Sequence, residues 1–142
     1  MKGSWRIARL AGVDIYLHWT FFLLIGWILF SYVTAGAGWA AAFTGVAFIL
    51  VLFSCVVLHE LGHATAARVF DVPTKDITIL PIGGVARLAR IPERPLQEFV
   101  IAVAGPLVNV LIAAALAVVI SGLAGAGQLW YGSAARFGDT RI

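Results

Sequence analysis

Two long stretches without a formal charge constrain this chain more than any other feature of its sequence. The first holds 45 residues between Asp14 and Glu60, and the second holds 37 residues between Glu98 and Arg136. A helix needs about 20 apolar residues to cross the hydrocarbon core of a bilayer. The first stretch is therefore long enough for two membrane-spanning helices and the second for one, so the sequence predicts an integral membrane protein.

The first stretch is interrupted by four small residues at positions 35–38 (Ala-Gly-Ala-Gly), a pattern typical of a turn between two helices. We predict an all-α integral membrane protein with three transmembrane helices, at about residues 16–34, 39–67 and 99–123. Residues 1–123 are then expected to form one membrane-embedded core, and residues 124–142 an unassigned polar tail.

The overall composition agrees with this class of protein. Apolar residues make up 61% and charged residues only 12% of the chain, whereas a soluble domain is about a quarter charged. Disordered segments and nucleic-acid-binding surfaces both need polar or basic sequence, so both are excluded. The lipid bilayer is the expected environment, no nucleic acid is expected as a partner, and no particular oligomeric state is predicted.

The basic residues indicate which side of the membrane each segment faces. Eight of the ten Lys and Arg residues lie before the first predicted span or within residues 68–98, and the other two, Arg136 and Arg141, follow the third span. Cytoplasmic segments of membrane proteins carry an excess of Lys and Arg. We therefore predict a multi-pass protein of the cell membrane whose N-terminus and residues 68–98 are cytoplasmic.

Residues 68–98 are expected to contain a short β-hairpin. Four prolines in this segment prevent a continuous helix. Two β-prone runs, residues 77–80 and 85–88, flank a turn that ends in Gly83 and Gly84. Two interpretations stay open: the glycines only make the turn of a surface loop, or the hairpin offers an edge strand that pairs with an extended peptide.

Residues 59–63 of the second predicted span read His-Glu-Leu-Gly-His. Residues four apart lie on one face of a helix, so His59 and His63 can present two imidazole nitrogens to one Zn²⁺ ion. Glu60 lies to one side of this pair and can reach a metal-bound water as general base. The pattern predicts a zinc site with His59 and His63 as ligands and Glu60 as the catalytic residue.

The position of these three residues disfavours a purely structural interpretation. Glu60 is the only formal charge among residues 15–67, and ionisable residues within a membrane span are costly and by default functional. A single histidine in an apolar segment is different, because packing and a hydrogen bond can account for it. His18, near the start of the first span, is therefore interpreted as a histidine at the membrane interface.

Three other segments, together with residues 59–63, resemble one family of membrane proteases. They are residues 12–19 (Gly-Val-Asp-Ile-Tyr-Leu-His-Trp), residues 80–86 (Leu-Pro-Ile-Gly-Gly-Val-Ala), and residues 97–109, which include Ala-Gly-Pro-Leu-Val-Asn. In this order, over about residues 10–122, they resemble the site-2 protease family, the intramembrane zinc metalloproteases of peptidase family M50. Within that family, the bacterial and archaeal branch is the most similar.

The resemblance implies regulated intramembrane proteolysis, in which a peptide bond in or near the transmembrane segment of a membrane protein substrate is hydrolysed. It implies zinc as the cofactor and the roles given above for the three motif residues. Asn109 is expected to position substrate or the oxyanion, or to join two helices through its amide. Gly83 and Gly84 are the candidate substrate-binding residues of the hairpin, whereas Gly105 and Pro106 are expected to serve close packing and a local helix distortion.

The chain departs from the family pattern in its last residues. Catalytic zinc usually has three protein ligands and a water, and the family takes its third ligand from an Asp in a Leu-Asp-Gly motif on a later helix. That motif does not occur in the 142 residues. Asp139, the only acidic residue after Glu98, lies in Gly-Asp-Thr and matches the motif poorly. We therefore expect a C-terminally truncated member in which the zinc metalloprotease core, residues 1–123, is incomplete.

Two alternatives follow from the missing ligand. One is a catalytically inactive membrane binding module that keeps the same fold. The other is a CAAX-type membrane zinc protease, which also has a His-Glu-x-x-His motif in a membrane. That class needs a downstream Glu ligand, and Glu98 instead precedes an uninterrupted apolar run.

Overall fold

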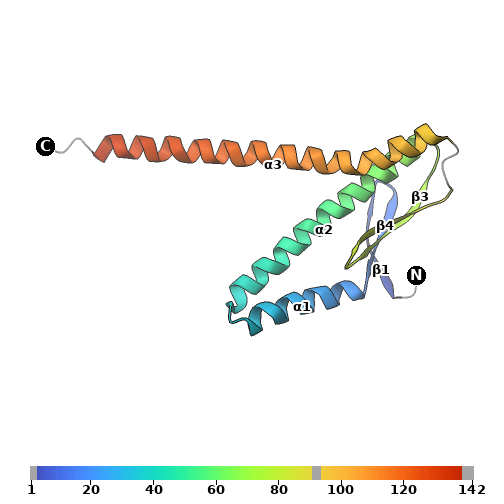
Figure 1. The fold of residues 1–142 in the computed structure, drawn as a ribbon, viewed down its shortest axis with the longest axis horizontal. Coiled ribbons are helices and arrows are strands. Elements are labelled where there is room, and N and C mark those ends of the chain that lie inside the picture. The colour runs from blue at the N-terminus through green and yellow to red at the C-terminus, as the bar shows by residue number, and fades with distance from the viewer. Residues whose placement is uncertain (1–2, 91–93, 139–142) are drawn as a thin grey trace. The chain divides into compact units, whose positions relative to one another are not determined.

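The computed structural model describes residues 3–90 and 94–138 (Figure 1). In chain order the elements are β1 (Ser4–Leu10), β2 (Val13–His18), α1 (Thr20–Thr34), α2 (Gly38–Val69), β3 (Thr74–Leu80), β4 (Gly83–Leu88) and α3 (Pro95–Gly138). The chain divides within α3 into two compact units, Met1–Asn109 and Val110–Ile142. The first unit contains the whole sheet, α1, α2 and the beginning of α3.

The first unit contains a four-stranded sheet in the order β1-β2-β3-β4, so the expectation of an all-α protein with a single hairpin is wrong. The two additional strands are β1 and β2, which pair antiparallel with Leu10 opposite Val13. They are joined by Ala11 and Gly12, which have φ angles of 49° and 81°. Two central residues with positive φ are what a type I′ hairpin turn requires. Ala-Gly is a weaker signal for this turn than Asn-Gly, so the sequence did not predict it.

The first predicted span is also corrected by the structure. Residues 16–18 belong to β2, and α1 begins at Thr20 and has only 15 residues. A helix of this length is about 22 Å long, which is less than the roughly 30 Å of a bilayer core. Residues 16–18 are extended because β2 pairs in parallel with β3, with Tyr16 opposite Thr78. The Nδ1 atom of His18 accepts the backbone N–H of Thr20 at 3.4 Å, at the start of α1.

Two of the described helices are long and apolar enough to cross a bilayer, namely α2 and the part of α3 from Pro95 to Ala124. α2 has 32 residues and agrees with the second predicted span. α3 extends beyond the predicted range of about 99–123 at both ends, since it begins at Pro95 and continues to Gly138. These helices support a membrane location, whereas the first of the three expected spans is not confirmed.

The hairpin expected within residues 68–98 is confirmed. β3 and β4 pair antiparallel, with Leu80 opposite Gly83 across the turn. Asp76 and Arg87 lie opposite each other, and Arg87 donates two hydrogen bonds to the carboxylate, one of them from Nε to Oδ1 at 2.7 Å. This hydrogen bonding, and then the negative charge of Asp76, raise the pKa of the Arg87 guanidinium. β4 is one of the two edge strands of the sheet.

The apolar core of the first unit lies between the sheet and helices α1 and α2. Successive side chains of a strand point to opposite faces, so alternate residues of β2 and β3 face the helices. One buried cluster consists of Ile15, Phe21, Phe53 and Ile79, and a second consists of Val13, Ala64 and Ile77. Burial of one large apolar side chain contributes about 1.5–3 kcal/mol. The two clusters together hold the sheet against the half of α2 that carries residues 59–63.

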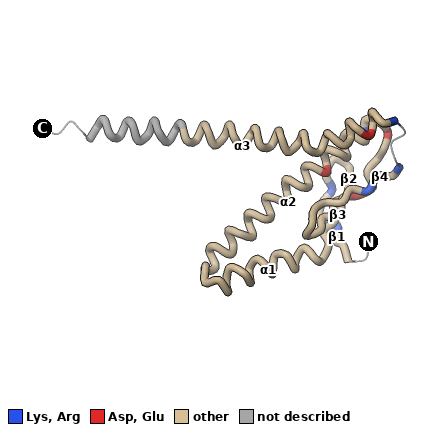
Figure 2. The backbone as a smooth tube through the Cα atoms, in the orientation of Figure 1, with Lys and Arg blue, Asp and Glu red and all other residues tan. Residues whose placement is uncertain are grey.

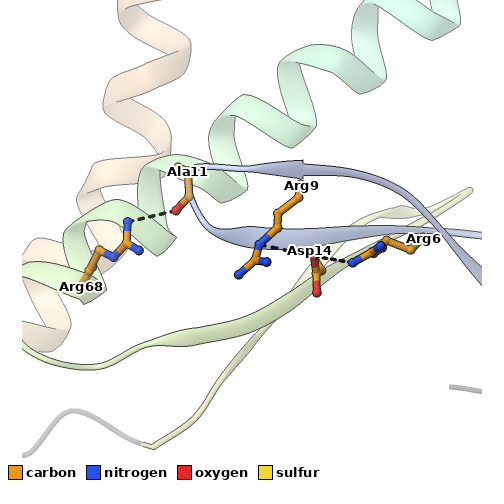
Figure 3. Close-up of polar contacts among 5 residues, drawn as sticks. All are labelled: Arg6, Arg9, Ala11, Asp14 and Arg68. Carbon is orange, nitrogen blue, oxygen red and sulfur yellow. Dashed lines mark hydrogen bonds and ion pairs between the residues drawn. The ribbon is translucent and has the colours of Figure 1, made fainter.

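Charged residues of the first unit gather at the sheet and at the adjoining helix ends (Figure 2). Arg6 and Arg9 of β1 approach the carboxylate of Asp14 at 3.5 and 3.7 Å, and Arg68 donates to the carbonyl oxygen of Ala11 at 3.0 Å (Figure 3). The last contact connects the β1–β2 turn to the end of α2. The exposed ion pairs add little stability, but the separation of charged sheet from apolar helices suits a protein at a bilayer surface.

Candidate metal centre

The two histidines of the sequence motif face each other on α2. Their Nε2 atoms lie 3.1 Å apart. In a tetrahedral zinc site with Zn–N distances of about 2.0–2.1 Å, two ligand nitrogens are separated by about 3.3 Å. His59 and His63 therefore already have the spacing of two ligands to one zinc ion, as the i, i+4 pattern predicts.

The second nitrogen of each imidazole has a partner on α3. Nδ1 of His63 donates to the backbone carbonyl oxygen of Ile101 at 2.7 Å, and Nδ1 of His59 lies 3.1 Å from Nδ2 of the Asn109 side-chain amide. A neutral imidazole that is protonated on Nδ1 keeps the lone pair of Nε2 for a metal. Metal-binding histidines usually make a hydrogen bond of this kind through their second nitrogen.

Gly105 of α3 lies directly against the imidazole rings of His59 and His63. A Cβ atom built on Gly105 would lie 2.2 Å from Nε2 of His63 and 2.8 Å from Nε2 of His59. Both distances are below van der Waals contact, so a side chain here would collide with both imidazole rings. The residues present fit a zinc ion through the spacing of the two histidine nitrogens. The close packing expected at Gly105 is thus packing against the two histidines.

Gly62 allows α2 and α3 to approach closely at the same level. A Cβ atom on Gly62 would lie 2.8 Å from both the carbonyl oxygen of Ala104 and Cγ2 of Val108. Small residues at helix contacts allow such close backbone approach within membranes. This contact brings residues of α3 within hydrogen-bonding distance of the motif histidines.

The hairpin reaches the site at Glu60. A Cβ atom on Gly84 of β4 would lie 2.7 Å from Cγ of Glu60, so the strand backbone passes directly beside this side chain. A Cβ atom on Gly83 would instead meet nothing within 4 Å, and Gly83 has a φ of 138° that other residues rarely adopt. The structure therefore brings Gly84 to the motif and leaves Gly83 at the turn.

The residues of α3 that line the site share a spacing that the sequence displays. Ile101, Gly105 and Asn109 are four apart, so they lie along one face of the helix. That face meets the face of α2 that carries His59 and His63. The four-residue spacing indicates that these residues share one face of α3. The sequence does not indicate which face of α2 that face contacts.

The structure does not describe a third protein ligand. Within residues 3–90 and 94–138, no group of three His, Cys, Asp or Glu side chains is placed to hold one metal ion. Asp139, the weak candidate from the sequence, lies outside the described residues. The described part of the candidate site consists of two histidines, a glutamate beside them and their partners on α3.

Comparisons with known proteins point to one family of peptidases. The sequence pattern of Peptidase family M50 matches residues 47–139. Over 120 residues the chain is 39% identical to a zinc metalloprotease of Methanocaldococcus jannaschii, which covers 84% of this chain and 33% of that protein. Over 63 residues it is 40% identical to stage IV sporulation protein FB of Bacillus subtilis, which covers 44% of this chain and 22% of that protein.

A solved structure extends the similarity from sequence to fold. The site-2 protease from Methanocaldococcus jannaschii matches 82% of this chain and 50% of its own chain, with a TM-score of 0.64 and 40% sequence identity. The chain spans 33% and 22% of the length of the two curated relatives named above.

Proposed function

The chain belongs to peptidase family M50, the site-2 protease family, and from this we propose that it forms the zinc-binding part of an intramembrane metalloendopeptidase. The reaction is hydrolysis of a peptide bond in or near the transmembrane segment of a membrane protein substrate, as in regulated intramembrane proteolysis. The observation that supports it most directly is the pair of Nε2 atoms 3.1 Å apart in front of Gly105. Membership of this family replaces the CAAX-type alternative.

The proposed roles follow from the positions of the side chains. His59 and His63 hold the zinc ion through Nε2, and their Nδ1 atoms are engaged on α3. When bound, zinc supplies Lewis acidity that polarises a carbonyl group and acidifies water. Glu60 follows His59 directly in the chain and accepts a proton from the attacking water as general base, then returns it to the leaving amine.

We also propose that β4 binds the substrate. It is an edge strand, so its outer backbone groups can pair with an extended peptide. Gly84 brings this strand against Glu60, and Gly83 lets the strand begin directly after the turn. A peptide bound along β4 would therefore pass beside the general base, which is where the scissile bond must lie.

The position of Gly84 gives a test of this substrate path. We expect Gly84→Ala to lower the rate of cleavage by about 10- to 100-fold, because the new Cβ must displace Glu60 and small displacements of a catalytic group cost this much. Zinc content should not change. Ile82→Ala, a change at a 94% exposed side chain in the β3–β4 turn, is the matched control. Normal cleavage by Gly84→Ala would exclude this path.

For the membrane, we propose three crossings with the N-terminus and residues 68–98 on the cytoplasmic side. α2 and α3 are long enough to cross, and the 15-residue α1 would cross with local thinning of the bilayer. Single cysteines at the exposed positions Ala37 and Lys75, in a Cys55→Ala background, show on which side of the membrane each position lies. An impermeant maleimide applied to intact cells should label Ala37→Cys and spare Lys75→Cys. Equal labelling of both would show that α2 does not cross, and labelling of Lys75→Cys alone would reverse the proposed orientation.

Metal removal tests the proposed function itself. Cleavage of a membrane protein substrate in detergent should stop when a chelator removes zinc and return when zinc is added. We expect weak zinc binding and slow cleavage by the 142-residue chain, and a rise in both when a helix with a Leu-Asp-Gly segment supplies a third ligand. Zinc binding without cleavage in the extended protein would instead support the inactive binding module.

A further inference from the structure

We propose that Asn109 is a positioning residue, whose side-chain amide oxygen accepts a hydrogen bond from Nδ1–H of His59 and so directs Nε2 of His59 into the metal site. The proposal rests on the zinc site of the proposed function. It differs from a contact of Asn109 with substrate or the oxyanion, and from a general helix-joining role, both of which the sequence allowed.

The position of the Asn109 amide supports this role. Its Nδ2 atom lies 3.1 Å from Nδ1 of His59, while Nε2 of the same ring faces Nε2 of His63. A neutral imidazole whose Nε2 binds metal carries its proton on Nδ1 and needs an acceptor there. The carboxamide presents either its oxygen or its nitrogen after a half-turn about its terminal bond. Its oxygen is the end that satisfies Nδ1–H when the metal is bound.

The two ligand histidines are oriented by unlike groups on one helix face. His63 is held by a main-chain carbonyl, that of Ile101, which no side-chain substitution removes. His59 is held by a side chain, eight residues further along the same face of α3. Gly105, midway between them, leaves room for both rings. Of these two hydrogen-bond partners, only that of His59 can therefore be removed by a substitution that leaves both histidines in place.

The three possible roles of Asn109 predict different effects when this residue is substituted. If Asn109 only joined two helices, its substitution would lower the stability of the protein whether or not metal is bound. A substrate-binding residue would affect cleavage and leave zinc affinity unchanged. A positioning residue changes zinc affinity, because a metal-binding histidine that loses its outer hydrogen bond typically loses about 10- to 100-fold in metal affinity.

The test measures the zinc dissociation constant of the 142-residue chain in detergent by competition with a coloured chelator. Asn109→Leu removes the hydrogen-bond acceptor, whereas Asn109→Asp keeps one. Leu107→Ala is an exposed control on the same helix, and His59→Ala removes a proposed zinc ligand. We expect Asn109→Leu to weaken zinc binding by about 10- to 100-fold, with Asn109→Asp and Leu107→Ala near the unmodified protein. The unfolding temperature of the metal-free protein should be the same for Asn109→Leu.

The outcomes separate this proposal from the proposed function. If His59→Ala binds zinc normally, the zinc site itself is wrong and both fail. If His59→Ala loses zinc but Asn109→Leu does not, only the positioning role fails. Weakened zinc binding that comes with a lower metal-free unfolding temperature, and that Asn109→Asp shares, would identify a helix-joining residue and also overturn the proposal.

Discussion

Glu60→Gln is expected to lower the rate of peptide hydrolysis by about 10²- to 10⁴-fold, the usual contribution of a general base, without loss of zinc. The amide has nearly the shape of the carboxylate but cannot accept a proton from water. Glu60 contacts β4 at Gly84 and is not one of the facing metal ligands. The measurement pairs zinc content with cleavage of a membrane protein substrate, in protein that carries a third zinc ligand.

The matched control for this substitution is Glu98→Gln, which removes a carboxylate from the first turn of α3. It should leave both zinc content and cleavage near those of the unmodified protein. Full activity of Glu60→Gln would show that another group acts as the base. Loss of zinc from Glu60→Gln would show that Glu60 is a ligand instead.

Gly105→Ala is expected to weaken zinc binding by more than about 100-fold, beyond the effect of losing one outer hydrogen bond. The added methyl group would lie 2.2 Å from Nε2 of His63 and 2.8 Å from Nε2 of His59. These distances are far below van der Waals contact, so at least one imidazole must turn away. A site that then keeps a single histidine cannot hold zinc firmly.

Gly122→Ala is the control on the same helix, because a Cβ atom there meets nothing within 4 Å. Both substitutions make the same gain in helix propensity, so a difference between them reports the local clash. Zinc affinity would be measured by chelator competition, together with the helical circular dichroism of each protein. Normal zinc binding by a folded Gly105→Ala protein would place the metal elsewhere.

Several features of this protein could be predicted because they depend on residues close together in the chain. His59 and His63 share a face through the repeat of a single helix, so their facing nitrogens follow from spacing alone. The β3–β4 hairpin follows from prolines, β-branched residues and glycines within about fifteen positions. The existence of α2 and of an apolar span within α3 follows from the absence of charge.

The residues around His18 show where local pattern failed. Residues 13–19 are apolar enough to begin a membrane helix, and they were predicted to do so from about residue 16. They form β2 instead, because β3, some 60 residues later, offers a parallel partner with Tyr16 opposite Thr78. Val13, Ile15 and Tyr16 are strand-forming residues, but the local sequence does not show the distant strand with which they pair.

Asn109 was already a candidate from the sequence, but only the tertiary structure decided which residues of α3 lie against the histidines. The sequence by itself determined the two histidines, the glutamate and the apolar helix that carries them. Only the crossing of α3 over α2 at Gly62 brings Ile101, Gly105 and Asn109 to the histidines, from 38 to 50 residues away in the chain. The physical reason is that helix spacing fixes which residues share a face, while side-chain packing decides which two faces meet.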